Sequence, residues 1–138
     1  LLVVPEHLDA DATRVAHDVE QALTTHGATV SRLTVDATAT DRADLSARLT
    51  TTAAEEQEPL AGILSLLGWA GGVQADCPTV PIAIATSLAL VQAVGDAGFG
   101  VPVWAVTRGA VSVVPGEVPE TAGAHLWALG RVAALEIP

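Results

Sequence analysis

The chain has 138 residues, half of them apolar and only four aromatic, and its sixteen acidic residues outnumber six Arg and no Lys to give a formal net charge of −10. Such an acidic surface repels phosphates, so DNA and RNA are excluded as partners. One cysteine, Cys77, excludes an internal disulfide and a cysteine-based metal cage and fits the reducing cytoplasm that we expect. We predict that this thiol is a small buried hydrophobe.

Residues 1–138 form one domain by length. The sequence contains no Met and opens directly on an apolar strand pattern, so we expect a fragment of a longer chain. No secretory leader is indicated at its start. The uncharged run 77–95 has a helical part of about a dozen residues, short of the roughly 20 that a bilayer requires. We therefore predict a buried helix there and no membrane partner.

The first half of the chain alternates strand and helix patterns. Residues 1–4 predict an apolar strand, and Asp9 or Asp11 caps a helix that Gly27 ends. Residues 28–35 predict the second strand. Strands separated by helices in this way indicate parallel pairing through crossover helices.

The same alternation continues in the second half. Asp41 opens a short helix, and the near-continuous apolar run 60–67 has the pattern of a strand covered on both faces. Residues 81–94 predict a helix that is apolar on almost every face and therefore central. Residues 101–107 predict a fourth strand and residues 121–136 a last helix. The fold class is α/β, a three-layer unit with a mainly parallel sheet flanked by helices.

The sequence argues against a dinucleotide site after the first strand. A Rossmann-type site needs glycines there, so that backbone can approach the pyrophosphate at a helix N-terminus. Residues 5–11 contain none and carry Asp9 and Asp11 instead. Asp36, after the second strand, stands where a ribose partner would sit, but we expect it to cap a helix or hold a loop.

A second interpretation arises from Asp9, Asp11 and Thr13, which match the Asp-x-Asp-x-Thr pattern of haloacid-dehalogenase-type phosphatases. That chemistry needs cationic stabilisation of the transition state. The family draws it from a Lys, which this chain lacks. Residues 5–8 also separate the motif from the strand that it should end directly. A phosphatase of this type and a stand-alone interaction module are therefore two alternative functions of the chain. Two other segments indicate a third function.

Two segments carry a family resemblance. Residues 102–111, PVWAVTRGAV, and 127–136, WALGRVAALE, resemble the structural subdomain of ketoreductases from modular type I polyketide synthases. Residues 33–36, 62–67 and 88–98 are similar to that family in order and spacing. The chain departs from the pattern at Ile137, where the family usually has His, and ends at Pro138, before a strand that normally follows.

The resemblance implies a truncated Rossmann-like unit that binds no nucleotide itself. In that family the unit packs against a following catalytic subdomain, which binds NADPH, carries the catalytic Tyr, Ser and Lys, and reduces a β-ketoacyl group bound to the acyl carrier protein. This chain has no Tyr and no Lys. We therefore expect it to be inactive alone, with no catalytic, cofactor or metal residues, and to act as a scaffold within the parent synthase.

Three residues are candidates for contact with the catalytic subdomain. Arg108 follows the fourth strand, at the edge where open parallel sheets bind ligands. We expect it to anchor the subdomain boundary by hydrogen bonds to carboxylate or carbonyl groups. Arg131 and Trp127 on the last helix are the other candidates. Trp104 and Trp127 are also expected to belong to the core.

Overall fold

The computed structural model describes residues 1–136, and the departures expected at Ile137 and Pro138 lie outside the described residues. Four short parallel strands form one sheet in the order β2-β1-β3-β4. The strands are β1 (Leu2–Pro5), β2 (Arg32–Val35), β3 (Ile63–Ser65) and β4 (Val103–Ala105). The predicted α/β class with a parallel sheet is confirmed.

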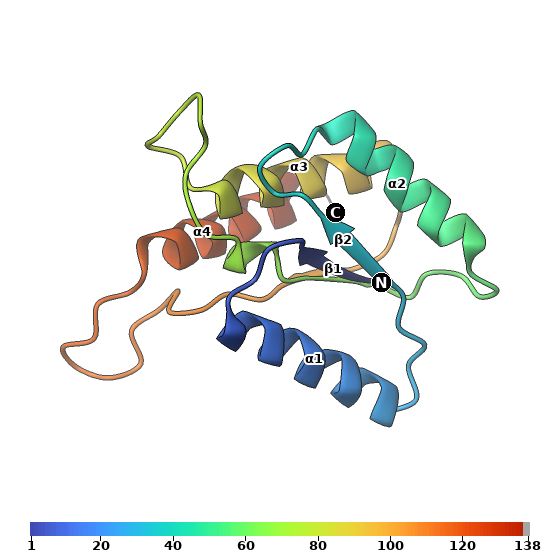
Figure 1. Cartoon of the computed structure of the whole chain (residues 1–138), viewed down its shortest axis with the longest axis horizontal. Helices are drawn as coiled ribbons and strands as arrows, with labels where there is room; N and C mark the ends of the chain where they lie inside the picture. The colour runs from blue at the N-terminus through green and yellow to red at the C-terminus, as the bar shows by residue number, and fades with distance from the viewer. Residues whose placement is uncertain (137–138) are drawn as a thin grey trace.

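Helices cover both faces of this sheet unequally (Figure 1). Helix α1 lies on one face, whereas α2 and α3 lie on the other and α4 packs beside α3. The helices are α1 (Ala10–Thr25), α2 (Arg42–Glu55), α3 (Ile82–Asp96) and α4 (Thr121–Glu136), with a 3₁₀ turn, η1 (Leu67–Trp69), after β3. None of these helices has the length and apolarity needed to cross a membrane, among residues 1–136.

Side-chain caps and glycines set the helix ends where the sequence predicted them. The Asp9 carboxylate accepts a hydrogen bond from the Ala12 amide at 2.7 Å, and α1 follows directly. Asp41 caps α2 in the same way. After α1, Gly27 has φ +87°, a left-handed conformation that costs a glycine little.

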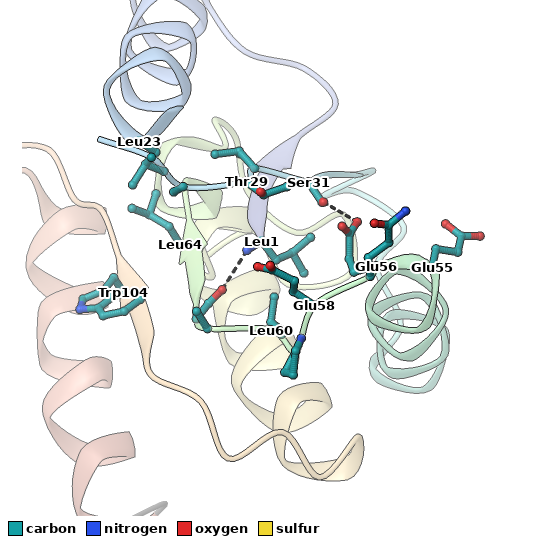
Figure 2. Close-up of a pocket in the computed structure, with 17 residues that line it drawn as sticks. Leu1, Leu23, Thr29, Ser31, Glu55, Glu56, Glu58, Leu60, Leu64 and Trp104 are labelled. Atoms are coloured by element: carbon teal, nitrogen blue, oxygen red, sulfur yellow. Dashed lines mark hydrogen bonds between the residues drawn. The ribbon is translucent and has the colours of Figure 1, made fainter. Parts of the chain in front are cut away.

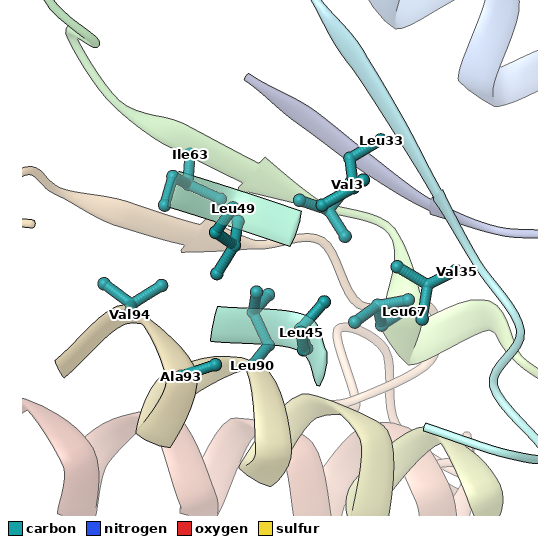
Figure 3. Packing of buried hydrophobic residues seen from close by; sticks show 10 residues of the cluster. All are labelled: Val3, Leu33, Val35, Leu45, Leu49, Ile63, Leu67, Leu90, Ala93 and Val94. Atoms are coloured by element: carbon teal, nitrogen blue, oxygen red, sulfur yellow. The ribbon is translucent and has the colours of Figure 1, made fainter. Parts of the chain in front are cut away.

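The larger core lies between the sheet and helices α2 and α3 (Figure 3). Ten buried aliphatic side chains from the strands, η1 and the two helices fill it. Helix α3 buries residues at seven positions, as its all-round apolar pattern predicted. The core under α1 is smaller and contains Leu2, Val4, Ala16 and Leu66. The two faces of the sheet are therefore covered to different extents.

The strands are shorter than the apolar runs that predicted them. The second strand begins at Arg32 rather than residue 28, and the third ends at Ser65, because the chain then turns into η1. The fourth spans only Val103–Ala105. Helix α3 starts at Ile82 with Pro81 as its N-cap residue, and it ends at Asp96 rather than Val94.

Three predictions of burial are wrong. Cys77 is exposed, because it lies in the loop between η1 and α3, where its sulfur is 3.4 Å from the Thr79 hydroxyl. Trp104 is 53% exposed on the edge strand β4. Trp127 is 48% exposed, because it lies on a side of α4 that no other described element covers. Both indoles lie outside the core.

Candidate subdomain interface

Two carboxylates occupy the end of α1 where a dinucleotide's pyrophosphate would have to lie. Asp9 caps the helix, and Asp11 in the first turn pairs with Arg14 at 3.0 Å. These carboxylates stabilise the positive end of the helix dipole. The phosphatase interpretation requires the same two carboxylates, which are already engaged in the helix cap and the ion pair. It also requires Asp9 at the end of a strand, whereas Asp9 lies at the N-cap of α1.

Asp36 is engaged within its own loop. Its carboxylate accepts hydrogen bonds from the Thr38 amide at 2.9 Å and the Thr38 hydroxyl at 2.7 Å. These bonds favour the charged form and hold the pKa of Asp36 below its ordinary value. The geometry is that of an Asx turn, so Asp36 organises its loop as expected.

Arg108 joins three segments at the carboxyl edge of the sheet. Its Nε lies 3.5 Å from a Glu120 carboxylate oxygen, just before α4. Its guanidinium carbon lies 5.2 Å from the centre of the Trp69 ring in η1. The Trp69 indole N–H is buried without a hydrogen-bond partner among the described residues. Arg108 therefore holds the chain after β4 against η1 and the start of α4.

Two glycines bring α4 into close contact with this edge. A Cβ at Gly123 would meet the Arg108 carbonyl oxygen and, at 3.2 Å, the Ala110 backbone. A Cβ at Gly68 would collide with the Leu126 side chain. Gly123 was not predicted from the sequence to be a packing residue. A glycine inside a predicted helix signals a close approach of backbone, and it could have revealed this contact.

The outward side of α4 is apolar. Trp127, Arg131 and Leu135 follow one another at intervals of four residues, so they lie along one side of the helix. The Arg131 guanidinium carbon lies 4.9 Å from the centre of the Trp127 ring. Leu135 is 87% exposed. The structure thus brings two of the predicted contact residues together and places Arg108 at the other end of the same helix.

The loop that leads into α4 also exposes apolar side chains. It carries four valines that are 48% to 86% exposed, namely Val111, Val113, Val114 and Val118. Large apolar patches that are exposed to solvent mark interaction sites. We call the four valines and the Trp127–Leu135 side of α4 the α4 surface. No cluster of potential metal ligands occurs in the part of the chain that the structure describes.

The fold and this edge define a Rossmann-like unit that lacks the glycine turn and exposes an apolar carboxy-terminal helix. No protein-family model matches the sequence. The chain is 44% identical over 137 residues to polyketide synthase GfsA of Streptomyces halstedii, and 41% identical over 141 residues to pikromycin polyketide synthase component PikAII of Streptomyces venezuelae. These matches cover 99% and 100% of the chain and only 2% and 4% of the two synthases.

Solved ketoreductases have the same fold. A C2-type ketoreductase from a modular polyketide synthase superposes with a TM-score of 0.86 at 39% identity, and the first ketoreductase of the tylosin synthase with 0.78 at 41%. The matches cover 98% and 99% of this chain and 29% and 28% of those chains. The chain belongs to the ketoreductases of modular polyketide synthases, which confirms the resemblance drawn from its sequence.

Proposed function

We propose that this chain is the structural half of a polyketide synthase ketoreductase and that it supports a catalytic half elsewhere in the same polypeptide. The observation that carries the proposal is the α4 surface, with Trp127 and Leu135 exposed on one side of the helix. Trp127 and Arg131 on this side of α4 are candidates for contact with the catalytic subdomain from the sequence. Covering it would remove apolar area from water, the main favourable term in protein association.

The residues of this chain argue against a catalytic role of its own. It contains neither Tyr nor Lys, the pair of residues that protonates the substrate in ketoreductases of the family that it resembles. Carboxylates occupy the helix end that would have to receive a pyrophosphate. NADPH, bound by the catalytic half, would supply the hydride that reduces a β-ketoacyl group on the acyl carrier protein. This chain would keep the cofactor and substrate groove of that half in shape.

The partners that follow are the catalytic half of the same chain and the carrier protein of the synthase. We propose a cytoplasmic synthase, with which the low cysteine content of this chain is consistent. The net charge of −10 opposes binding to nucleic acid.

Calorimetric titration with NADPH tests the proposal. We expect no heat of binding with the 138-residue chain and clear binding with the intact ketoreductase. Micromolar binding to the 138-residue chain alone would contradict the proposal, because a nucleotide site would then exist without a glycine turn.

A variant pair tests the α4 surface directly. Trp127→Ala in the intact ketoreductase should destabilise the contact between the halves by ~2 kcal/mol or more if Trp127 is an anchor of the kind found at interface centres. Its effect is measured as a lower melting temperature together with slower reduction. Val73→Ala is the control for the loss of an exposed apolar side chain, since Val73 is 50% exposed in the loop between η1 and α3. Equal effects of the two substitutions would argue against the α4 surface.

A further inference from the structure

The face of the sheet under α1 is only half covered. Leu2, Leu64 and Trp104 are register partners on β1, β3 and β4, so their side chains point to the same face. Leu2 is fully buried in the core beneath α1, Leu64 is half-buried and Trp104 is 53% exposed. These three side chains therefore become step by step more exposed from β1 towards β4.

Trp104 is held in this exposed position by its neighbours. Its ring lies directly against Gly62, where a Cβ would collide with the indole. Gly62 therefore lets the indole pack onto the strand backbone, which restricts its motion. An indole that is already ordered loses little further freedom when a partner covers it, and such aromatic side chains dominate interface energies.

A pocket of about 930 Å³ adjoins Trp104 at the amino edge of the sheet (Figure 2). Leu64 and Trp104 lie on one side of this pocket, together with Leu23 from the end of α1. The other side carries carboxylates at the end of α2 and just after it, namely Glu55, Glu56 and Glu58. We call this pocket the amino-edge pocket.

The charges around the amino-edge pocket are one-sided. None of its lining residues is Arg, Lys or His, and the Leu1 nitrogen on its border donates to the Gly62 carbonyl at 2.8 Å. Glu56 contacts the Ser31 hydroxyl, whereas no contact of Glu55 or Glu58 with an Arg or His of residues 1–136 is seen. A complementary occupant would carry apolar side chains for the indole side and a cation for the carboxylate side.

We propose that the amino-edge pocket and Trp104 receive a segment of the ketoreductase chain outside residues 1–138, one that combines apolar side chains with a Lys or Arg. This contact lies at the amino edge of the sheet, between Trp104 and the end of α2, and it shares no lining residue with the α4 surface. Most of each solved ketoreductase chain lies outside the part that matches these residues, so such a segment is available in the same polypeptide. The proposal rests on the proposed function, since it adds a second contact between this unit and the rest of the ketoreductase.

Thiol labelling of the intact ketoreductase tests the proposal. Cys77→Ser removes the exposed native thiol of this region, and a single cysteine is then introduced as Ala61→Cys, Thr24→Cys or Leu135→Cys. All three positions are exposed within residues 1–136. Ala61 lines the amino-edge pocket, Thr24 lies outside it on α1, and Leu135 lies on the α4 surface. The rate of maleimide labelling is measured by mass spectrometry of the peptide that carries the introduced cysteine. The rate in the native protein is then compared with the rate in urea.

We expect Ala61→Cys to label about tenfold or more slowly in the native state than in urea, while Thr24→Cys labels at nearly equal rates in both. Fast labelling at Ala61 with slow labelling at Leu135 would overturn this inference and leave the proposed function standing. Fast labelling at Leu135 with slow labelling at Ala61 would support this inference and contradict the α4 surface as the contact of the proposed function. Protection at Ala61 that disappears on dilution would identify a second copy as the occupant and would also overturn the inference.

Two further variants separate the apolar and charged parts of the contact. Trp104→Ala should restore labelling of Ala61→Cys, and Trp104→Phe should restore it much less. The double substitution Glu55→Gln and Glu58→Gln should raise the labelling rate severalfold, because a cation in the occupant would lose its partners. Unchanged labelling in the double variant would overturn the proposed Lys or Arg.

Discussion

Arg42 and Asp96 connect two helices that are far apart in sequence. The Arg42 guanidinium at the start of α2 donates two hydrogen bonds to the Asp96 carboxylate at the end of α3, with Nε–Oδ2 at 2.5 Å and Nη2–Oδ1 at 2.6 Å. A bidentate pair of this kind fixes orientation as well as distance. It lies beside the larger core, whose side chains come partly from the same two helices.

This pair predicts a pH-dependent contribution to stability. The hydrogen bonds from Arg42 hold the pKa of Asp96 below its ordinary value of 3.8. A carboxyl whose pKa is lower in the folded state stabilises the fold above its unfolded pKa, and this contribution is lost as pH falls through the folded pKa. Asp96→Asn should therefore lower stability at neutral pH, and the difference from the unchanged chain should shrink on acidification. Urea unfolding across this pH range measures it.

Asp76→Asn is the control for that experiment, since Asp76 lies in an exposed loop with no ion pair among the described residues. A difference for Asp96→Asn that stays constant from neutral to acidic pH would contradict the linkage argued from this ion pair.

Two glycines of α4 predict opposite responses to the same substitution. Gly123→Ala forces a Cβ into the backbone at Arg108 and Ala110, so we expect a loss of about 1–3 kcal/mol in the free energy of unfolding. Gly130→Ala meets no atom within 4 Å and should stabilise the helix by ~0.5–1 kcal/mol. Urea titrations of the two variants measure the difference. Equal effects would mean that α4 does not pack closely on this edge.

The sequence was sufficient to predict the order of the helices and strands and the residues that cap α1 and α2. Both rest on local chemistry: the caps at Asp9 and Asp41 satisfy backbone amides of their own first turns, and Gly27 provides a left-handed residue. The strand ends were less accurate, because apolar residues continue beyond the hydrogen-bonded part into loops. The run 60–67, for example, contains β3 and the first residue of η1.

The exposure of Trp104 and Trp127 could not be predicted from local pattern. An indole in an apolar strand or helix is expected in the core, and only the strand order shows that β4 lies at an edge. The packing roles of Gly62 and Gly123 likewise depend on contacts with residues that are distant in sequence, the Trp104 ring and the Arg108 carbonyl. Candidate contact residues were therefore named from the family resemblance, and the surfaces they belong to emerged from the tertiary structure.

The cap of α1 predicts how Asp9 should respond to substitution. Asp9→Ala removes the acceptor of the Ala12 amide and should cost about 1 kcal/mol, whereas Asp9→Asn keeps an acceptor and should cost much less. Thermal unfolding of the two variants compares these costs. A phosphatase nucleophile would behave differently, because neither variant would retain activity. Hydrolysis of a generic phosphoester by the unchanged chain that both variants abolish would revive that interpretation.

Arg108 predicts a coupled loss of stability and reduction. In the intact ketoreductase, Arg108→Gln removes the ion pair with Glu120 and the contact with the Trp69 ring, and the latter alone is worth ~0.5–1 kcal/mol at an exposed site. We expect a lower melting temperature and slower reduction, with partial recovery in Arg108→Lys. Arg14→Gln is the control, because that residue also pairs with a carboxylate but lies on α1. An Arg108→Gln ketoreductase with unchanged stability and unchanged reduction would show that Arg108 does not anchor the boundary between the two halves.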